Sequence, residues 1–268
     1  MKTVVITGSA RGFGFEMAKE FKLRNLNVVI CDINKECLNK AKKELEKIDN
    51  TSHVLSYNID ITNEDEVSFM IKDIINKFNT IDIWINNAGV NQENKPLWEI
   101  DSNKISRLLN IDLKGTIICS KLIMPIMIKQ NDGFIYNVEG FGSDDAKMLG
   151  LSIYGTSKRA VTYFTESLAL ESKLLNTNVK IGKITPGIMI TNFIDTSLGD
   201  GDKIYLDERT KKVYNILGDY PDVIAKYMVN KILKNKKNNS KITWLTKRKA
   251  FSRFLLSPFN KNDYFKEK

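Results

Sequence analysis

The chain has 268 residues, enough for one large α/β domain or two small ones with a substantial core. Its 42 % hydrophobic and 27 % charged residues are ordinary for a soluble globular protein. The sequence has no run of about 18 apolar residues, so no membrane-spanning helix is predicted.

The single histidine, His53, argues against a histidine-based triad or a multi-histidine metal site, and the three cysteines lack metal-ligand spacing, so we expect no metal. The N-terminus lacks the features of a signal peptide, and we expect a cytoplasmic protein.

The positive charge is concentrated at the C-terminal end. Residues 231–268 contain 12 Lys/Arg and 2 Asp/Glu, whereas residues 1–230 contain 29 Lys/Arg and 30 Asp/Glu. The body of the protein is therefore not expected to bind nucleic acid.

Short apolar runs rich in Val and Ile alternate with amphipathic segments along the chain. Strands are predicted over 2–7, 27–32, 53–59, 81–86, 133–138, 179–185 and 240–245. Helices are predicted over 12–25, 34–49, 63–78, 101–130, 152–176 and 221–235. Buried strands separated by helices indicate an α/β fold, with a single doubly wound parallel sheet of the Rossmann-like, three-layer αβα type.

The predicted domain organisation follows from this pattern. Residues 1–235 form the Rossmann-like domain, and residues 236–268 form a basic, amphipathic C-terminal extension. Residues 187–220 mix Gly, Asp, Thr and Lys, and we expect an irregular segment long enough to be a substrate lid.

The first predicted strand runs into a glycine-rich loop, "TGSARGFG", in which Arg11 and Phe13 flank Gly12. Gly8 permits a tight turn, Gly12 lets the backbone approach a pyrophosphate, and Gly14 allows the following helix to pack on the strand. The helix N-terminus then faces the phosphates, although an ordinary βα turn is the alternative interpretation.

The second predicted strand ends at Asp32. A carboxylate at this position accepts hydrogen bonds from both ribose hydroxyls and repels a 2′-phosphate, which favours NAD(H). Arg11 leaves NADP(H) open, because a basic side chain there could reach a 2′-phosphate. Alternatively, Asp32 is a solvated carboxylate at the end of a strand and has no role in cofactor binding.

Several motifs occur in a fixed order: "TGSARGFG" at 7–14, "DI" at 60–61, "NNAG" at 86–89, "YGTSK" at 154–158 and "PGIMIT" at 186–191. With these motifs, residues 2–195 resemble the short-chain dehydrogenase/reductase family. The resemblance implies that Asp60 and Ile61 flank the adenine and that Asn87, Ala88 and Gly89 support the cofactor. It also implies that the segment from Pro186, through Ile188 and Thr191, holds the nicotinamide carboxamide.

The resemblance makes Tyr154 the proton donor in carbonyl reduction and the proton acceptor in alcohol oxidation. An unperturbed tyrosine has a pKa of about 10, too high for a base at neutral pH. Lys158 lies one helical turn away on the same face, and its charge is expected to lower the pKa of Tyr154. In the family this lysine also hydrogen-bonds the nicotinamide ribose.

Two positions depart from the family pattern. Asp112 stands where the family usually has an asparagine that fixes a helix kink and a water, and it could pair with Lys158 or simply replace the amide. Gly140 stands where the family usually has the serine that binds the substrate oxygen. The pattern "NVEGFGS" is similar to a branch that includes the plant chlorophyll b reductases, which makes Ser143 the candidate for the missing hydroxyl. A plain loop hydroxyl is the alternative for Ser143.

These observations predict an NAD(P)-dependent oxidoreductase that acts on a carbonyl/alcohol pair. The apolar residues Met189, Ile190, Phe193 and Ile194 in the lid favour an apolar small-molecule substrate. The resemblance further implies a homodimer or homotetramer. The competing interpretation, motivated by Gly140 and Asp112, is a catalytically weak or inactive nucleotide-binding regulator or membrane-attached scaffold.

Residues 246–259, "TKRKAFSRFLLSPF", combine four basic residues with five large apolar ones. As a helix, this segment gathers its apolar residues on one side. It either docks on the body near the substrate cleft or attaches peripherally to an anionic membrane.

Overall fold

In the computed structural model, which describes residues 1–191, 208–260 and 262–265, seven parallel strands form one sheet. The sheet order is β3-β2-β1-β4-β5-β6-β7, and every neighbouring pair is parallel. The strands are β1 (Thr3–Thr7), β2 (Asn27–Asp32), β3 (Val54–Asn58), β4 (Ile83–Asn86), β5 (Gly133–Val138), β6 (Val179–Thr185) and β7 (Ser240–Thr243). The predicted doubly wound parallel sheet is confirmed.

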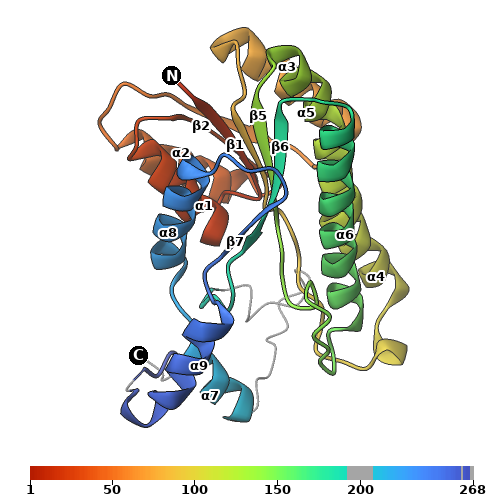
Figure 1. Cartoon of the computed structure of the whole chain (residues 1–268), viewed down its shortest axis with the longest axis vertical. Coiled ribbons are helices and arrows are strands. Elements are labelled where there is room, and N and C mark those ends of the chain that lie inside the picture. Colours follow the sequence, from red (N-terminus) through yellow and green to blue (C-terminus); the bar gives the residue numbers. More distant parts are fainter. Residues whose placement is uncertain (192–207, 261, 266–268) are drawn as a thin grey trace.

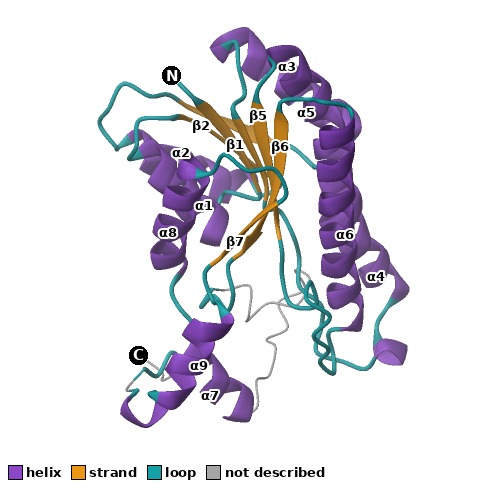
Figure 2. Cartoon of the chain, in the orientation of Figure 1, coloured by secondary structure: helices purple, strands orange, loops and turns teal. Residues whose placement is uncertain are grey.

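Helices cover both faces of the sheet and give the molecule three layers (Figures 1 and 2). One face carries α1 (Gly12–Lys22), α2 (Lys35–Glu46) and α8 (Pro221–Lys234). The other carries α3 (Glu64–Phe78), α5 (Thr116–Gln130) and α6 (Ser152–Leu174), with α4 (Ser102–Leu109) beside α6. The direction of strand succession reverses between β1 and β4, which opens a crevice at the carboxyl ends of these strands.

Successive residues of each central strand face opposite layers, as the period of a strand requires. In β1, Val4 and Ile6 pack against α1 and α8, whereas Val5 packs against the layer of α3 and α5. All five residues of β1 are buried. This explains why the central strands are continuous apolar runs in the sequence, without a polar alternation.

The single helix predicted over 101–130 is interrupted. The chain forms α4, then a π-helical segment, η2 (Asn110–Gly115), and then α5. Such wide turns are rare and occur frequently at functional sites. Asp112 lies inside this segment, so the interruption places its carboxylate toward the carboxyl ends of the strands.

The predicted irregular segment 187–220 contains a helix, α7 (Glu208–Leu217), while residues 192–207 lie outside the described part of the chain. The predicted extension begins with β7, so the sheet continues beyond residue 235. The segment after it forms α9 (Lys247–Leu255), as predicted, and two short 3-10 turns occur at η1 (Leu97–Glu99) and η3 (Ser257–Phe259). No helix in the described part of the chain has the combination of length and hydropathy that a membrane span requires.

Candidate active site

A cavity of about 1800 Å³ lies along the carboxyl ends of the strands. Its lining contains every residue that the sequence assigns to cofactor binding: Gly8, Arg11, Gly12, Phe13, Gly14, Asp32, Asp60, Ile61, Asn87, Ala88, Gly89, Tyr154, Lys158, Pro186, Ile188 and Thr191. These residues come from segments spread over more than half of the chain. The fold therefore brings the glycine loop and the Tyr154–Lys158 pair to one continuous site.

Asp32 stands at the glycine-loop end of the cavity. Its Oδ2 accepts a hydrogen bond from the backbone N–H of Ala10 at 3.2 Å, and its Oδ1 accepts one from Asn34 at 3.0 Å. A carboxylate oxygen can accept more than one hydrogen bond, so both oxygens retain capacity for further donors. Arg11 is exposed and lines the same region of the cavity.

Asn87 joins the ends of β1 and β4 at the point where the strand order reverses. Its side-chain amide donates to the backbone oxygens of Thr7 at 3.0 Å and of Gly8 at 2.9 Å. The Thr7 hydroxyl in turn accepts hydrogen bonds from the backbone N–H groups of Asn87 and Ala88, each at 3.0 Å. These bonds hold the glycine loop against the end of β4.

Tyr154 and Lys158 project from the first turns of α6 into the cavity, and both are buried. The Lys158 ammonium lies 5.4 Å from the centroid of the Tyr154 ring. The side-chain oxygen of Gln92 accepts hydrogen bonds from the backbone N–H groups of Ile153 at 2.8 Å and Tyr154 at 2.9 Å. Gln92 thus satisfies two of the free donors at the start of the helix that carries Tyr154, a role that no sequence motif signalled.

Asp112 and Lys158 form an ion pair. The distance from Asp112 Oδ2 to Lys158 Nζ is 2.9 Å, and Asp112 Oδ1 accepts a hydrogen bond from the backbone N–H of Val90 at 2.8 Å. Of the two roles left open for Asp112, pairing with the lysine is the one that the structure contains. Asp112 is not among the described residues that line the cavity, so it reaches the site through Lys158.

Burial and charge act together on these three groups. Burial raises the pKa of Tyr154, the Lys158 ammonium opposes this, and Asp112 and Tyr214 add to it, so that the net pKa lies above its usual value. Burial opposes the charge of Lys158, yet Asp112 and Tyr154 raise the net pKa of the ammonium. Burial likewise raises the pKa of Asp112 against the influence of Lys158. The expected lowering of the Tyr154 pKa by Lys158 is therefore outweighed in the free protein.

Gly140 leaves no room for a side chain. A β-carbon at this position would overlap the Tyr154 hydroxyl and would lie 3.0 Å from Tyr154 Cζ and 3.1 Å from Lys158 Cγ. The Tyr154 phenol therefore occupies the space that a side chain at position 140 would need.

Ser143 does not take the place that was predicted for it. Its hydroxyl accepts a hydrogen bond from the backbone N–H of Gly140 at 3.2 Å and donates to the backbone oxygen of Lys158 at 3.4 Å. Ser143 is buried and is not among the described residues that line the cavity. Gly142, with φ of +93°, turns the loop sharply between Gly140 and Ser143, and this turn points the hydroxyl toward α6. The placement supports the alternative role, a hydroxyl that fixes the loop.

Glu139 is a second buried acid of the site, for which no role was predicted. It lines the cavity and accepts hydrogen bonds from the hydroxyls of Thr162 at 2.9 Å and Thr185 at 2.7 Å. Its Oε2 lies 2.8 Å from Lys241 Nζ. These contacts join β5, α6, β6 and β7, so Glu139 holds the helix that carries Tyr154 to three strands.

The end of the cavity that α7 lines has both apolar and polar side chains: Val213 and Tyr214, and on the same helix Arg209 and Thr210. Further apolar lining residues are Phe141, Met148, Leu151, Met189 and Ile190. Val213 and Tyr214 belong to α7, which the sequence did not predict. Of the four apolar lid residues, Met189 and Ile190 line the cavity, and Phe193 and Ile194 lie outside the described residues.

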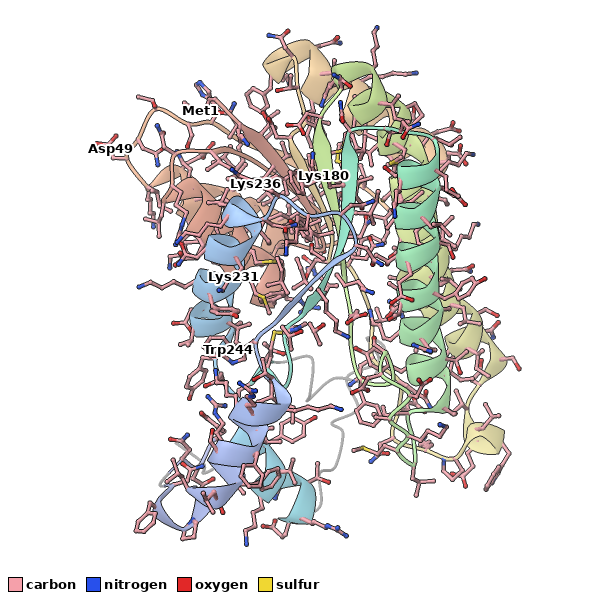
Figure 3. The ribbon with its side chains drawn as sticks, in the orientation of Figure 1. Met1, Asp49, Lys180, Lys231, Lys236 and Trp244 are labelled. Atoms are coloured by element: carbon pink, nitrogen blue, oxygen red, sulfur yellow. The ribbon has the colours of Figure 1, made fainter. Side chains whose placement is uncertain are left out.

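The C-terminal segment docks next to this end of the cavity. Trp244, labelled in Figure 3 between the sheet and α9, donates a hydrogen bond from Nε1 to Asp219 Oδ2 at 2.6 Å. Arg253 donates to Asp219 Oδ1 at 3.0 Å and to the backbone oxygen of Leu217 at 2.9 Å. The segment therefore contacts the body of the protein, as the first of the two interpretations predicts, and α9 contacts α7 directly.

Comparisons with known proteins agree with this geometry. A family model described as short chain dehydrogenase matches residues 2–200. The chlorophyll(ide) b reductase NOL, chloroplastic, of Oryza sativa subsp. japonica is 32 % identical over 257 residues, covering 93 % of this chain and 73 % of the relative. The probable chlorophyll(ide) b reductase NYC1, chloroplastic, of Arabidopsis thaliana is 29 % identical over 261 residues, covering 91 % of this chain but only 51 % of the relative.

Among solved structures, NAD⁺-bound xylitol dehydrogenase superposes with a TM-score of 0.78 at 23 % identity, covering 90 % of this chain and 96 % of that one. This likeness shows the fold. Together with the family model, which matches well over half of the chain, these findings show that the protein belongs to the short-chain dehydrogenase family of NAD(P)-dependent oxidoreductases.

Proposed function

We propose that the protein transfers hydride reversibly between NAD(H) and a carbonyl/alcohol pair, with Tyr154 as the proton donor and acceptor. The observation that carries this proposal is the position of Tyr154 and Lys158 in the same cavity as the glycine loop. An inactive shell is not favoured, because both reactive side chains are intact and buried beside each other. The missing serine leaves this pair unaffected, since Gly140 makes room for the phenol.

The lining fits a nicotinamide dinucleotide. A β-carbon at Gly12 would meet no atom within 4 Å, so the loop backbone there faces open space in which a pyrophosphate fits. When bound, the cofactor supplies or accepts the hydride. Lys158 would hold the nicotinamide ribose, the segment Pro186 to Thr191 would hold the carboxamide, and Tyr154 would exchange the proton with the substrate oxygen.

Asp32 supports a preference for NAD(H) over NADP(H). Its carboxylate lines the cavity and is fixed by two backbone N–H groups, so it cannot turn away without losing both hydrogen bonds. A fixed carboxylate accepts from ribose hydroxyls and repels a phosphate. The Arg11 side chain is exposed, and no backbone group in the described part of the chain is seen to fix it as two N–H groups fix Asp32. Arg11 is therefore expected to influence the choice of cofactor less than Asp32 does.

We propose a bulky, largely apolar carbonyl compound as the substrate. The apolar side chains of the cavity, Val213 and Tyr214 of α7 among them, support this. The names of the relatives refer to chlorophyll(ide) b, which is a large and mostly apolar molecule. We propose a substrate of similar size and apolar character for this protein, and not chlorophyll(ide) b itself.

A homo-oligomer assembled through α5 and α6 is also proposed. Large apolar side chains are exposed on these helices: Ile117, Ile128, Tyr163, Leu170 and Leu174. Light scattering coupled to size exclusion would detect a dimer or tetramer. A monomer at all concentrations would contradict this part of the proposal.

We further propose a cytoplasmic protein that attaches peripherally to anionic membranes through α9 and η3. The apolar side chains Phe251, Leu255, Leu256 and Phe259 are each more than half exposed, and Lys247 and Arg248 beside them are exposed as well. Basic residues near an anionic surface contribute about 1 kcal/mol each. Flotation with phosphatidylserine vesicles tests this: Phe251→Ser/Leu255→Ser should lose binding, and Leu175→Ser, an exposed control remote from the tail, should keep it.

The function itself is tested with purified protein, NADH, NADPH and a panel of aromatic and aliphatic ketones. We expect NADH-dependent reduction of apolar ketones. Tight binding of NADH without turnover of any carbonyl compound would contradict the proposed function.

A further inference from the structure

The ion pair between Asp112 and Lys158 is enclosed by protein. The exposed fractions of the two side chains are 0 % and 8 %, and the joined atoms lie 2.9 Å apart. The second carboxylate oxygen is fixed by the Val90 backbone N–H, so Asp112 cannot swing away from the lysine without losing that bond. The π-helical turn of η2 holds the carboxylate in this place.

This arrangement changes what Lys158 can do for Tyr154. A lone ammonium beside a phenol stabilises the tyrosinate, because opposite charges attract strongly where water is excluded. Among the described residues, the titratable groups that act on the phenol come from three elements: Lys158 on α6, Asp112 in η2 and Tyr214 on α7. The Asp112 carboxylate opposes the influence of the Lys158 ammonium on the phenol, so the pair stabilises a tyrosinate less than the ammonium alone would.

We propose that Asp112 sets this site for carbonyl reduction at neutral pH, by holding the Lys158 ammonium in a buried ion pair and so keeping Tyr154 in its protonated form. The inference rests on the proposed function. In reduction, the carbonyl carbon receives the hydride of the reduced nicotinamide, and the carbonyl oxygen takes the phenolic proton of Tyr154, whose oxygen is then reprotonated from solvent. Oxidation is the reverse, and it begins only when Tyr154 has already lost its proton.

Asp112 leaves the equilibrium constant of the reaction unchanged. It sets the pH above which the oxidative direction runs. A neutral asparagine at the same position, the usual residue of the family, would leave the Lys158 charge uncompensated beside the phenol. Asp112→Asn replaces the carboxylate with a neutral amide of nearly the same shape. Its effect on Tyr154 therefore reports the charge of Asp112 and not its shape.

The test is a titration of Tyr154 in the cofactor-free protein, followed by NMR of tyrosine labelled with ¹³C at Cζ. The Tyr154→Phe variant assigns the resonance. We expect Tyr154 of the wild type to titrate above pH 10, and we expect Asp112→Asn to lower its midpoint by about one unit or more. Asp65→Asn, which removes an exposed carboxylate from α3, should leave the midpoint in place.

A wild-type midpoint below pH 8, or an unchanged midpoint in Asp112→Asn, would overturn the inference. If Asp112→Asn does not fold, the titration of the wild type, assigned with Tyr154→Phe, still tests the inference, because a midpoint below pH 8 would overturn it. The titration needs no turnover, so its result can be interpreted even if the proposed function is wrong.

In active protein, the pH midpoint of kcat/KM for alcohol oxidation should move in the same direction. A downward shift of one unit raises the rate at pH 7.5, relative to the plateau at high pH, about tenfold. If Asp112→Asn shifts the NMR midpoint of Tyr154 but not the pH profile of kcat/KM, Tyr154 is not the base. That result would contradict the proposed function but not the effect of Asp112 on Tyr154.

Discussion

Gly140 and Tyr154 face each other so closely that a β-carbon at position 140 would overlap the phenolic oxygen. The Tyr154 hydroxyl therefore fills the space that a side chain would need at the position where the family usually has a substrate-binding serine. Restoring the serine would push the phenol away and not repair the site.

We accordingly expect Gly140→Ser to lower kcat at least about tenfold, because a displacement of a reacting group by an ångström or less is costly. The measurement is steady-state ketone reduction with NADH, with the melting temperature as a check on folding. A folded Gly140→Ser variant that is as fast as the wild type would refute this view of the site.

Ser143→Ala is the companion variant. Among the described residues, its hydroxyl hydrogen-bonds backbone atoms of Gly140 and Lys158, so we expect a loss of about 1 kcal/mol in the free energy of unfolding. The rate should fall much less than in Gly140→Ser. A loss of activity by two orders of magnitude without a loss of stability would instead assign Ser143 to the substrate.

Asp32→Ser should reverse the cofactor preference. Removing the carboxylate deletes a charge-assisted acceptor for the ribose, worth about 1.5 to 3 kcal/mol, and removes the repulsion of a 2′-phosphate. We expect kcat/KM for NADH to fall at least about tenfold and that for NADPH to rise. If the ratio of the two values is unchanged, Asp32 does not read the ribose; Asp65→Ser serves as the matched control.

Gln92→Ala should destabilise the start of α6. Two backbone N–H groups, those of Ile153 and Tyr154, lose their common acceptor, which costs about 1 to 2 kcal/mol by analogy with the loss of a helix cap. Gln92→Glu keeps an acceptor at this place and should lose less. Urea denaturation measures both variants, and equal stability of Gln92→Ala and the wild type would exclude the capping role.

Lys158→Met should make stability depend on pH. The variant leaves Asp112 buried without its cation, and burial already raises the pKa of this carboxyl while Lys158 opposes the increase. A carboxyl whose pKa is raised in the folded state costs stability as the pH rises above its unfolded pKa of about 4.

We therefore expect Lys158→Met to lose up to about 3 to 5 kcal/mol at pH 7.5 and distinctly less at pH 5. Lys158→Met/Asp112→Asn should lack this pH dependence. Thermal melting at both values measures it, and the same pH dependence in the single and double variants would contradict the pairing.

Much of the fold follows from local pattern. Buried Val and Ile runs such as those of β1 and β2 lie between amphipathic helices, and this regularity predicts the parallel sheet and the edge on which the site forms. The glycine loop, Asp32, Tyr154 and Lys158 meet at that edge because each follows a strand or begins a helix there. The strand order and the direction of the strands are therefore enough to predict that these residues lie near one another.

Other features depend on contacts between distant segments. The π-helical turn at Asp112 interrupts a continuous amphipathic pattern, and only its packing against Lys158 and Val90 reveals a reason for it. The direction of Ser143 depends on the left-handed backbone of Gly142, which the sequence allows but does not require. Gln92 has no motif at all, and α7 lies in a segment whose polar composition resembles a loop.

The central claim, that Tyr154 exchanges the proton with the substrate, is tested most directly by Tyr154→Phe. This variant keeps the ring packing and the Lys158–Asp112 pair but removes the phenolic hydroxyl. We predict that NADH binding, measured by fluorescence titration, stays within about threefold while ketone reduction falls at least about a hundredfold, the contribution expected of a general acid. Ketone reduction by Tyr154→Phe at the wild-type rate would contradict the account.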